Sequence, residues 1–271
     1  ESMRSDFQAN GIITLTTDFG HRGPFVGTMK GVIHSRFLDA RIVDLTNEAH
    51  VHWPAEAGFW IARCYHYFPS GTVHLGVVDP GVGSDRSLIV AFGDGHVFLG
   101  PDNGLLAEVV EKTGANVYLM TEDLLKKYQL PTVSDTFHGR DVFAPVAAAL
   151  ASRVLTEVNC GLLIDNIVPS LLEYPEIRGG VLSGVVVTTD HFGNLITNIE
   201  KSEIQKFSDP VVSIGGHEIN FQRTYSNVKP GTFLALFNSS NVVEVACAEQ
   251  NASQLLSMQQ GAPVQVYERQ V

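Results

Sequence analysis

The first 165 residues alternate between strand-like and helix-like segments, and this alternation limits the possible folds more than any other feature. Apolar β-branched runs predict strands, and apolar residues at helical spacing predict helices. Such alternation is typical of βαβ units, so we expect an α/β domain with a mainly parallel sheet. The predicted strands are 12–17, 41–45, 72–78, 88–92, 96–99 and 117–120, and the predicted helices are 25–35, 55–67, 105–112, 121–128 and 140–151.

The chain beyond residue 180 has a different pattern, with short β-rich segments separated by turns. The preceding stretch 166–180 contains two prolines and a Gly-Gly pair, and we interpret it as a linker. We therefore expect two domains, an α/β domain over 11–168 and a smaller all-β, barrel-like domain over 178–271. The predicted strands of the second domain are 181–189, 195–199, 211–214, 232–237, 242–246 and 264–267.

Composition disfavours several classes of function. A net charge of −11, with no basic run longer than Lys126-Lys127, argues against a nucleic-acid partner. Cys64, Cys160 and Cys247 are odd in number and widely spaced, which predicts free thiols in a reducing compartment, the cytoplasm. No apolar run approaches the ~18 residues of a membrane span, so no membrane partner is expected. The polar residues 1–10 are typical of a tag remnant or a flexible lead rather than a signal peptide.

The stretch 77–86 (VVDPGVGSDR) places an acid directly after an apolar strand. A Pro-Gly-Val-Gly turn ends the strand, so Asp79 is expected at its carboxyl end, where open α/β sheets bind ligands. Arg86 follows seven residues later and can fold back toward Asp79. In isolation, the pattern fits a surface Asp–Arg pair on a turn at least as well as a site.

Two further segments favour a functional site. Residues 134–141 (SDTFHGRD) precede an apolar helical run, so we expect a helix N-terminus there, with His138 just ahead of it. Residues 13–20 (ITLTTDFG) form another predicted strand that ends in an acid, Asp18. Together, these segments predict one site assembled from distant parts of the chain. The ten histidines show no metal-ligand spacing, so no metal is expected.

Six motifs in this order resemble the S-adenosylmethionine (SAM) hydroxide adenosyltransferases, also called SAM hydrolases, which are relatives of the fluorinase and the chlorinase. The motifs are TDFG (17–20), VGTMKGVI (26–33), FPSGTVHLGVVDPGVG (68–83), GPDNGLL (100–106), TFHGRDVFAPVAA (136–148) and DHFGNLITNI (190–199). The resemblance covers nearly the whole chain. It implies SAM as the small-molecule substrate, no cofactor, and a homotrimer in which the second domain completes the site of a neighbouring subunit.

The resemblance also implies roles for individual residues. Asp79, Arg86 and His138 match the family's water-handling triad. Asp18 matches a residue beside the substrate ribose, although a helix cap is an alternative for it. The other implied substrate-binding residues are Phe19, Trp53, Pro80, Val82, Thr136, Phe137, Gly139, Asp190, Phe192, Asn194 and Ser239. Trp53 fits a core aromatic equally well.

The chain departs from its relatives near the amino-acid end of the implied substrate. Gly23 and Phe25 stand where many members have an acid and a tyrosine, and Ser240 replaces an arginine of the fluorinase. We therefore expect a polar contact to that end of the substrate to be lost or rebuilt.

The implied reaction is attack of water on the ribose C5′ of SAM, which gives adenosine and methionine. Asp79 would accept a hydrogen bond or proton from the water, Arg86 would keep Asp79 ionised, and His138 would orient the water or relay the proton. Halogenating relatives carry a tyrosine where this chain has Asp79, and a carboxylate would repel a halide, which disfavours a chlorinase-like activity. A non-catalytic adenosine or SAM sensor is the alternative from another class, which the intact triad disfavours.

Overall fold

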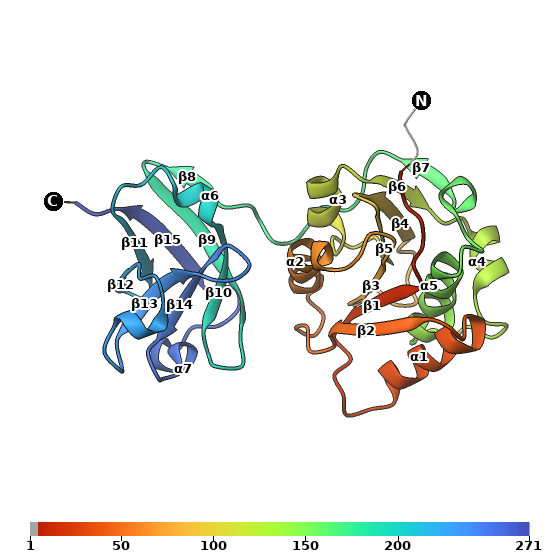
Figure 1. Cartoon of the computed structure of the whole chain (residues 1–271), viewed down its shortest axis with the longest axis horizontal. Coiled ribbons are helices and arrows are strands. Elements are labelled where there is room, and N and C mark those ends of the chain that lie inside the picture. Colours follow the sequence, from red (N-terminus) through yellow and green to blue (C-terminus); the bar gives the residue numbers. More distant parts are fainter. Residues whose placement is uncertain (1–4, 271) are drawn as a thin grey trace. The chain divides into compact units, whose positions relative to one another are not determined.

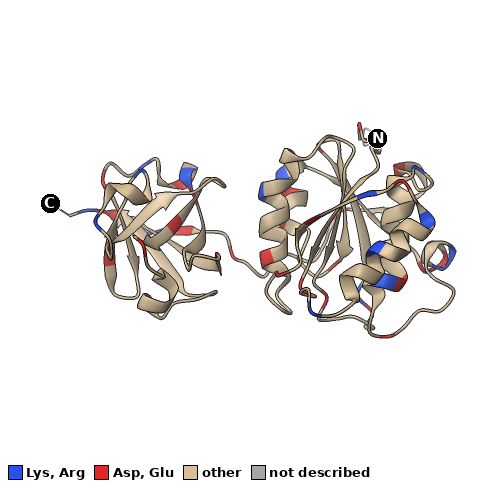
Figure 2. Cartoon of the chain, turned by 60° about the horizontal axis from the view of Figure 1, so that its bottom comes forward, with Lys and Arg blue, Asp and Glu red and all other residues tan. Residues whose placement is uncertain are grey.

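The computed structural model describes residues 5–270, and this part of the chain forms two compact units (Figure 1). The first unit ends at Leu171 and the second begins at Leu172. In the described residues, acidic and basic residues are interspersed along the ribbons of both units (Figure 2). None of the described helices is long and apolar enough to cross a membrane.

The first unit is built on one mixed sheet. Its strands lie in the order β2-β1-β3-β5-β4-β6-β7. They are β1 (Ile12–Thr17), β2 (Arg41–Thr46), β3 (Val73–Val77), β4 (Leu88–Gly93), β5 (His96–Pro101), β6 (Asn116–Leu119) and β7 (Leu162–Ile164). β1 pairs in parallel with both β2 and β3, and β3 pairs in parallel with β5.

The prediction of a mainly parallel sheet is wrong for the other half of this sheet. The β4–β5, β4–β6 and β6–β7 pairs are all antiparallel. β4 and β5 are joined by the two residues Asp94 and Gly95, both with positive φ (51° and 74°). A connection this short reverses the chain into a hairpin, whereas parallel neighbours need a crossover of a dozen or more residues.

Helices cover both faces of this sheet (Figure 1). On one face, α1 (Phe25–Arg36) and α5 (Ala144–Ala151) pack through residues such as Met29, Ile33 and Val146. On the other face, α2 (Pro54–Cys64) and α3 (Ala107–Thr113) contribute Ala57, Ile61 and Val109 to a separate core. The remaining helical segments are α4 (Glu122–Tyr128), the π-helix Gly139–Phe143 and the 3₁₀ turns Tyr65–Tyr67 and Glu157–Asn159.

The helix expected over 140–151 begins with a π-helical turn instead of an α-helical one. Pro145 has no N–H group to donate to the carbonyl of Asp141, four residues earlier. That carbonyl instead accepts the N–H of Leu130 at 2.8 Å. The wider turn therefore places Gly139 and His138 at the start of α5 without leaving the Asp141 carbonyl unpaired.

The second unit is an antiparallel, nearly closed barrel, as predicted in outline. Its strands lie in the order β12-β11-β15-β9-β10-β14-β13, with β8 paired to β9. A bridge between Phe221 and Ala235 brings the two ends of this order together. The elements are β8 (Glu176–Arg178), β9 (Val181–Thr189), β10 (Leu195–Glu200), α6 (Lys201–Ile204), β11 (Pro210–Ile214), β12 (His217–Asn220), a 3₁₀ turn (Tyr225–Asn227), β13 (Phe233–Phe237), β14 (Val242–Cys247), α7 (Ala252–Leu256) and β15 (Pro263–Glu268).

Two segments differ from their sequence-based expectations. The predicted linker 166–180 contains β8, which pairs antiparallel with β9. The predicted flexible lead lies outside the described residues over 1–4, but its remainder is packed. Phe7 meets Phe92 edge-on at 5.6 Å between ring centroids, and the Ala9 carbonyl accepts from Arg153. The polarity of this segment concealed these two anchors.

Thr14, His74 and His96 form a buried row of polar contacts across the parallel strands β1, β3 and β5. The Thr14 hydroxyl lies 2.8 Å from Nδ1 of His74, whose Nε2 lies 3.1 Å from Nδ1 of His96. His74 also stacks on Phe98, with 5.2 Å between ring centroids. Burial, followed by the neighbouring His96, lowers the pKa of His74 to about 3. His74 is therefore neutral in the folded protein at every pH above about 3.

Acid should destabilise the fold through this histidine. Between pH 6.5 and about 3 the unfolded chain protonates His74 and the folded chain does not, so the unfolding free energy falls as the pH falls. One such proton corresponds to roughly 1.4 kcal/mol per pH unit. Urea unfolding across this range should show a shallower pH dependence for His74→Phe. His21→Gln, at an exposed position, should match the unsubstituted protein. An unchanged slope for His74→Phe would show that the folded protein protonates His74 normally.

Candidate active site

Loops that follow neighbouring parallel strands form one side of the site. Because β1, β2 and β3 run in parallel, their carboxyl ends lie at the same edge of the sheet. Asp18 follows β1, the loop 47–53 follows β2, and Asp79 follows β3. Asn47 ties the first two loops together, since its side-chain oxygen accepts from the Thr17 hydroxyl at 2.8 Å and its carbonyl accepts from the Gly20 N–H at 2.7 Å.

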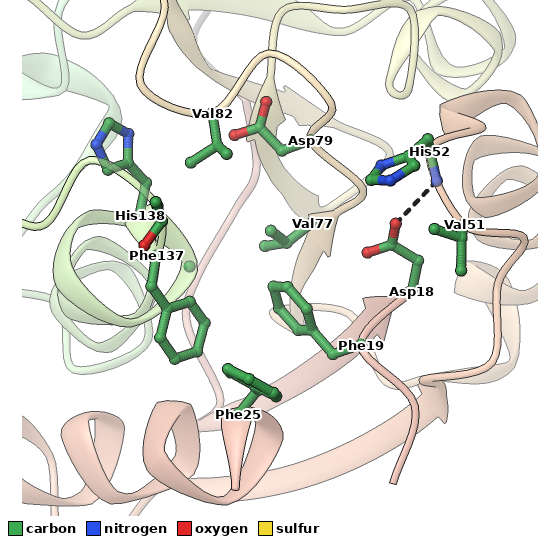
Figure 3. A pocket seen from close by; sticks show the side chains of 12 residues that line it. Asp18, Phe19, Phe25, Val51, His52, Val77, Asp79, Val82, Phe137 and His138 are labelled. Atoms are coloured by element: carbon green, nitrogen blue, oxygen red, sulfur yellow. Dashed lines mark hydrogen bonds between the residues drawn. The ribbon is translucent and has the colours of Figure 1, made fainter. Parts of the chain in front are cut away.

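These loops and the start of α5 enclose a cavity of about 430 Å³ (Figure 3). Its size suits a ligand of nucleoside dimensions or somewhat larger. Two aspartates, two histidines and three phenylalanines contribute to its lining. The lining residues are Asp18, Phe19, Phe25, Val51, His52, Val77, Asp79, Val82, Thr136, Phe137, His138 and Gly139.

Arg86 joins the acid of one loop to the histidine of another. Its Nε lies 3.0 and 2.9 Å from the two carboxylate oxygens of Asp79, and its Nη2 lies 2.6 Å from Oδ2. The same Nη2 lies 2.9 Å from Nδ1 of His138. The side chains of Asp79 and Arg86 are only 5% and 15% exposed, so solvent screens this pair weakly.

The contact with Arg86 fixes the protonation of His138. A guanidinium can only donate, so Nδ1 must accept, and the ring proton of the neutral imidazole lies on Nε2. Burial, followed by the positive charge of Arg86, lowers the pKa of His138, although the charge of Asp79 opposes this shift. His138 is therefore held neutral near neutral pH.

Backbone packing sets the distance between the two loops that carry this triad. Gly83 has φ +79°, and a Cβ there would lie 2.5 Å from the carbonyl oxygen of Asp135. Glycine is therefore required for the loop after β3 to approach residues 134–141. Asn103, in the segment after β5, donates to the Val78 carbonyl at 2.9 Å and so anchors the residue directly before Asp79.

Asp141 organises the segment before α5. Its buried carboxylate accepts from the Ser134 N–H at 2.8 Å and from Nε of Arg140 at 2.7 Å. Burial by itself raises its pKa, but hydrogen bonds from Arg140 and Ser134 outweigh this effect and lower the pKa overall. The ionised Asp141 thus holds residues 134–141 in place and leaves His138 free to face Arg86.

Asp18 is held from the loop that follows β2. Its Oδ2 accepts the backbone N–H of His52 at 3.0 Å (Figure 3). His52 has φ 63°, a left-handed conformation that is costly for a residue with a side chain. No side chain caps α1, whose N-cap position is Pro24, so the helix-cap alternative for Asp18 is wrong. The carboxylate instead points into the cavity.

Most of the first-unit residues singled out in the sequence lie at this cavity. Trp53, Pro80 and Arg86 are not among its lining residues, although Arg86 contacts Asp79 and His138, which are. Trp53 precedes α2 and meets His50 edge-on, with 6.3 Å between ring centroids. Sequence reasoning missed Val51, His52 and Val77, which line it. The positive φ of His52 carries only a weak sequence signal, because histidine is enriched in that conformation but most histidines do not adopt it.

The second unit carries the other singled-out residues on two turns. Asp190 closes the turn between β9 and β10 by accepting the N–H groups of Phe192 and Asn194, each at 2.9 Å. Ser239 lies on the turn between β13 and β14. Beside Asn194, the sequence analysis missed a contact in which the hydroxyl of Tyr225, an exposed residue, donates to the buried Glu244. Burial and then the charge of Asp190 raise the pKa of Glu244, against hydrogen bonds from Tyr225 and Asn238.

The described residues contain no cluster of three or more His, Cys, Asp or Glu side chains that could hold a metal ion.

Family models match both units of the chain. The model described as the SAM hydroxide adenosyltransferase N-terminal domain matches residues 13–159, and the model of the C-terminal domain matches residues 184–265. The chain belongs to the SAM hydroxide adenosyltransferase family. The resemblance noted in the sequence is thereby confirmed.

Relatives of the family align over almost the full length of the chain. A protein of Thermus thermophilus named (R)-S-adenosyl-L-methionine hydrolase is 34% identical and covers 94% of this chain and 98% of its own. A protein of the same name from Methanocaldococcus jannaschii is 33% identical, with 91% and 92% covered. A fluorinase of an Actinoplanes species is 31% identical over 73% of this chain and 74% of its own. A crystal structure of an uncharacterised conserved protein from Thermotoga maritima superimposes with a TM-score of 0.85 at 31% identity, over 94% of this chain and 100% of that one.

Removing Arg86 should raise the pKa of His138. Arg86→Gln removes the cation at Nδ1 while the attraction of Asp79 remains, so the imidazole should protonate more easily. NMR titration of the histidine ring signals, assigned through His138→Gln, measures this change. Arg153→Gln is the matched control, because Arg153 belongs to the same unit and contacts the Ala9 carbonyl. An unmoved titration in Arg86→Gln would leave burial as the whole cause.

Proposed function

We propose that this protein hydrolyses S-adenosyl-L-methionine to adenosine and methionine by attack of water on the ribose C5′. The observation that carries the proposal is the Asp79–Arg86–His138 arrangement at a cavity that Asp18 also lines. Homologous SAM hydrolases aligned over more than 90% of the chain support the same reaction. Because those relatives are named for the (R) epimer, we expect this protein to prefer the (R) configuration at sulfur.

The reaction needs placement more than activation of the leaving group. The sulfonium already makes methionine a good leaving group, so an in-line approach of water and exclusion of other solvent contribute most. The water oxygen forms a bond to C5′ as the C5′–S bond breaks. The electron pair of that bond returns to sulfur and gives a neutral thioether, and the water loses a proton to become the adenosine 5′-hydroxyl.

Asp79 is the group we assign to the water. Its carboxylate lines the cavity, and Arg86 contacts both of its oxygens. The positive charge of Arg86 beside this carboxylate stabilises hydroxide character in the attacking water. The remaining lone pairs of Asp79 are free to accept from the water and, as the bond to C5′ forms, to receive its proton.

His138 contributes mainly by orienting Arg86. Its Nδ1 already accepts from Arg86, so this nitrogen cannot take a proton from the water without losing that contact. The low pKa of His138 keeps the imidazole neutral, which avoids placing a second cation beside the cationic substrate. We therefore assign His138 a positioning role and expect a proton relay through it to be secondary.

Asp18 is the group we assign to the ribose. The His52 N–H occupies one lone pair of Oδ2, and Oδ1 remains available to accept from the two ribose hydroxyls. Thr136, Phe137, Gly139 and Val82 form further parts of the cavity wall. The carboxylate of Asp79 beside that wall would repel a halide, which argues against a chlorinase-like activity.

Several finer predictions rest on the family resemblance. They are a homotrimer, a cytoplasmic location, independence from metal and cofactor, and substrate contacts from Trp53, Pro80, Asp190, Phe192, Asn194 and Ser239. They stay predictions for this chain.

Isotope labelling tests the reaction. In H₂¹⁸O, the purified protein should form adenosine with the label in its 5′-hydroxyl, together with unlabelled methionine, whether or not a chelator is present. Mass spectrometry of both products, with (R) and (S) epimers supplied separately, measures this and the epimer preference. Binding of SAM without any product would favour the sensor alternative, and adenosine without label in its 5′-hydroxyl would exclude attack of water at C5′.

Substitutions in the triad should lower turnover more than binding. Asp79→Ala and Arg86→Ala should each reduce kcat by roughly 10²-fold or more, because both act on the water. His138→Gln should cost less than either, since it acts through Arg86. The Asp79→Ala/Arg86→Ala double variant should lose far less than the product of the single losses, because the two residues act as a unit. Single-turnover kinetics and equilibrium binding separate the two effects, and near-full turnover of Asp79→Ala would contradict the assignment.

A further inference from the structure

We propose that Phe25 and Phe19 form an aromatic subsite for the sulfonium cation, and that Phe25 makes the protein prefer a charged over a neutral sulfur. This inference deepens the proposed function and rests on it. It concerns two residues close in sequence, Gly23 and Phe25.

Three phenylalanine rings lie together at the cavity. The centroids of Phe19 and Phe137 are 5.4 Å apart, those of Phe25 and Phe137 are 5.5 Å apart, and both pairs meet edge-on. Phe19 and Phe25 are tilted by only 32° to each other, with centroids 6.1 Å apart. The guanidinium of Arg140 already lies 5.1 Å from the Phe137 centroid, so Phe19 and Phe25 are the rings whose faces remain for a ligand.

Phe25 combines a place at the cavity with an exposed side chain. It begins α1 and is 46% exposed although its ring lines the cavity. Gly23 permits this placement, because a Cβ at Gly23 would lie 2.5 Å from Cε2 of Phe25. An acid at position 23 would therefore displace the ring. The two residues act together, since Gly23 makes room for the ring of Phe25.

In-line displacement places the sulfur on the aromatic side. The attacking water lies beside Asp79, so C5′ must lie between the water and the sulfur. Figure 3 shows Asp79 and Val82 at one end of the cavity and Phe19 with Phe25 at the other. With the ribose at Asp18, a substrate whose C5′ faces Asp79 directs its sulfonium toward these two rings.

The chemistry of the rings suits a sulfonium and not a thioether. An aromatic face attracts a cation within about 6 Å of its centroid, and it has no comparable attraction for a neutral sulfur. Phe19 and Phe25 carry no donor or acceptor group, so they add no preference for the methionine carboxylate or amine. The subsite would thus separate the charged substrate from the neutral thioethers that share its adenosine.

The subsite should act on binding and not on the chemical step. The positive charge on sulfur disappears as the C5′–S bond breaks, so the attraction is strongest in the ground state. Loss of a ground-state interaction raises KM and does not lower kcat. This distinguishes Phe25 from Asp79, whose loss should lower kcat.

Calorimetry on a variant with reduced turnover tests the proposal. In the Asp79→Ala background, SAM and its neutral analogue S-adenosylhomocysteine are titrated into protein with Phe25, Phe25→Leu or Phe25→Tyr. Leucine keeps an apolar contact and removes the aromatic face, whereas tyrosine keeps the face. We expect Phe25→Leu to weaken SAM binding by roughly 3- to 30-fold with little change for S-adenosylhomocysteine. Phe25→Tyr should retain the preference for the charged ligand.

A second variant and a kinetic measurement test the subsite without relying on Phe25→Leu alone. Gly23→Ala should reproduce part of the selective loss by pushing the Phe25 ring aside. With Asp79 restored, Phe25→Leu should raise KM for SAM while kcat stays equal or rises. Equal losses for both ligands, or no loss, would overturn the subsite. Failure of the parent protein to bind SAM or to form adenosine would instead overturn the proposed function.

Discussion

Parallel pairing of β1 with β2 on one side and β3 on the other determines where each functional loop of the first unit begins. The carboxyl ends of the three strands share one edge, so Asp18, the loop 47–53 and Asp79 meet although they are far apart in sequence. The antiparallel β4–β5 hairpin extends the sheet beyond this group. A change of strand order would separate the loops, whereas a change within a loop alters only the ligand that the edge can bind.

Within this frame, the ion pair of Asp79 and Arg86 sets the electrostatics of the cavity. Removing two charges from water is costly, and the three short contacts between Arg86 and the carboxylate offset that cost. Replacing either Asp79 or Arg86 with a neutral residue would leave the other charge buried without its partner. Arg86 also donates to His138, so the cation that pairs with Asp79 also lowers the pKa of the imidazole, after the larger effect of burial.

The cavity is polar at one end and aromatic at the other, which corresponds to the two halves of the proposed reaction. The end at Asp79 suits a water that must lose a proton. The end at Phe19 and Phe25 suits a sulfur that begins as a cation and leaves neutral. Between them, Asp18 is held by a backbone N–H from a strained residue, His52, which fits the tendency of backbone strain to occur at functional sites.

The sequence by itself determined the local features of this protein. β-Branched runs predicted β1 and β9 to the residue, and the turn after β3 showed that Asp79 ends a strand, because strand periodicity and turn chemistry are encoded within a few residues. The family motifs added the residues of the triad. Other features became visible only in the folded chain. They include the antiparallel direction of β4 and the π-helical turn before α5. They also include three contacts between distant residues, namely Arg86 with His138, the His52 N–H with Asp18, and Tyr225 with Glu244. Each of these depends on which distant segments become neighbours. The order of strands in the sheet sets those neighbours, and no periodic pattern within a single segment encodes that order.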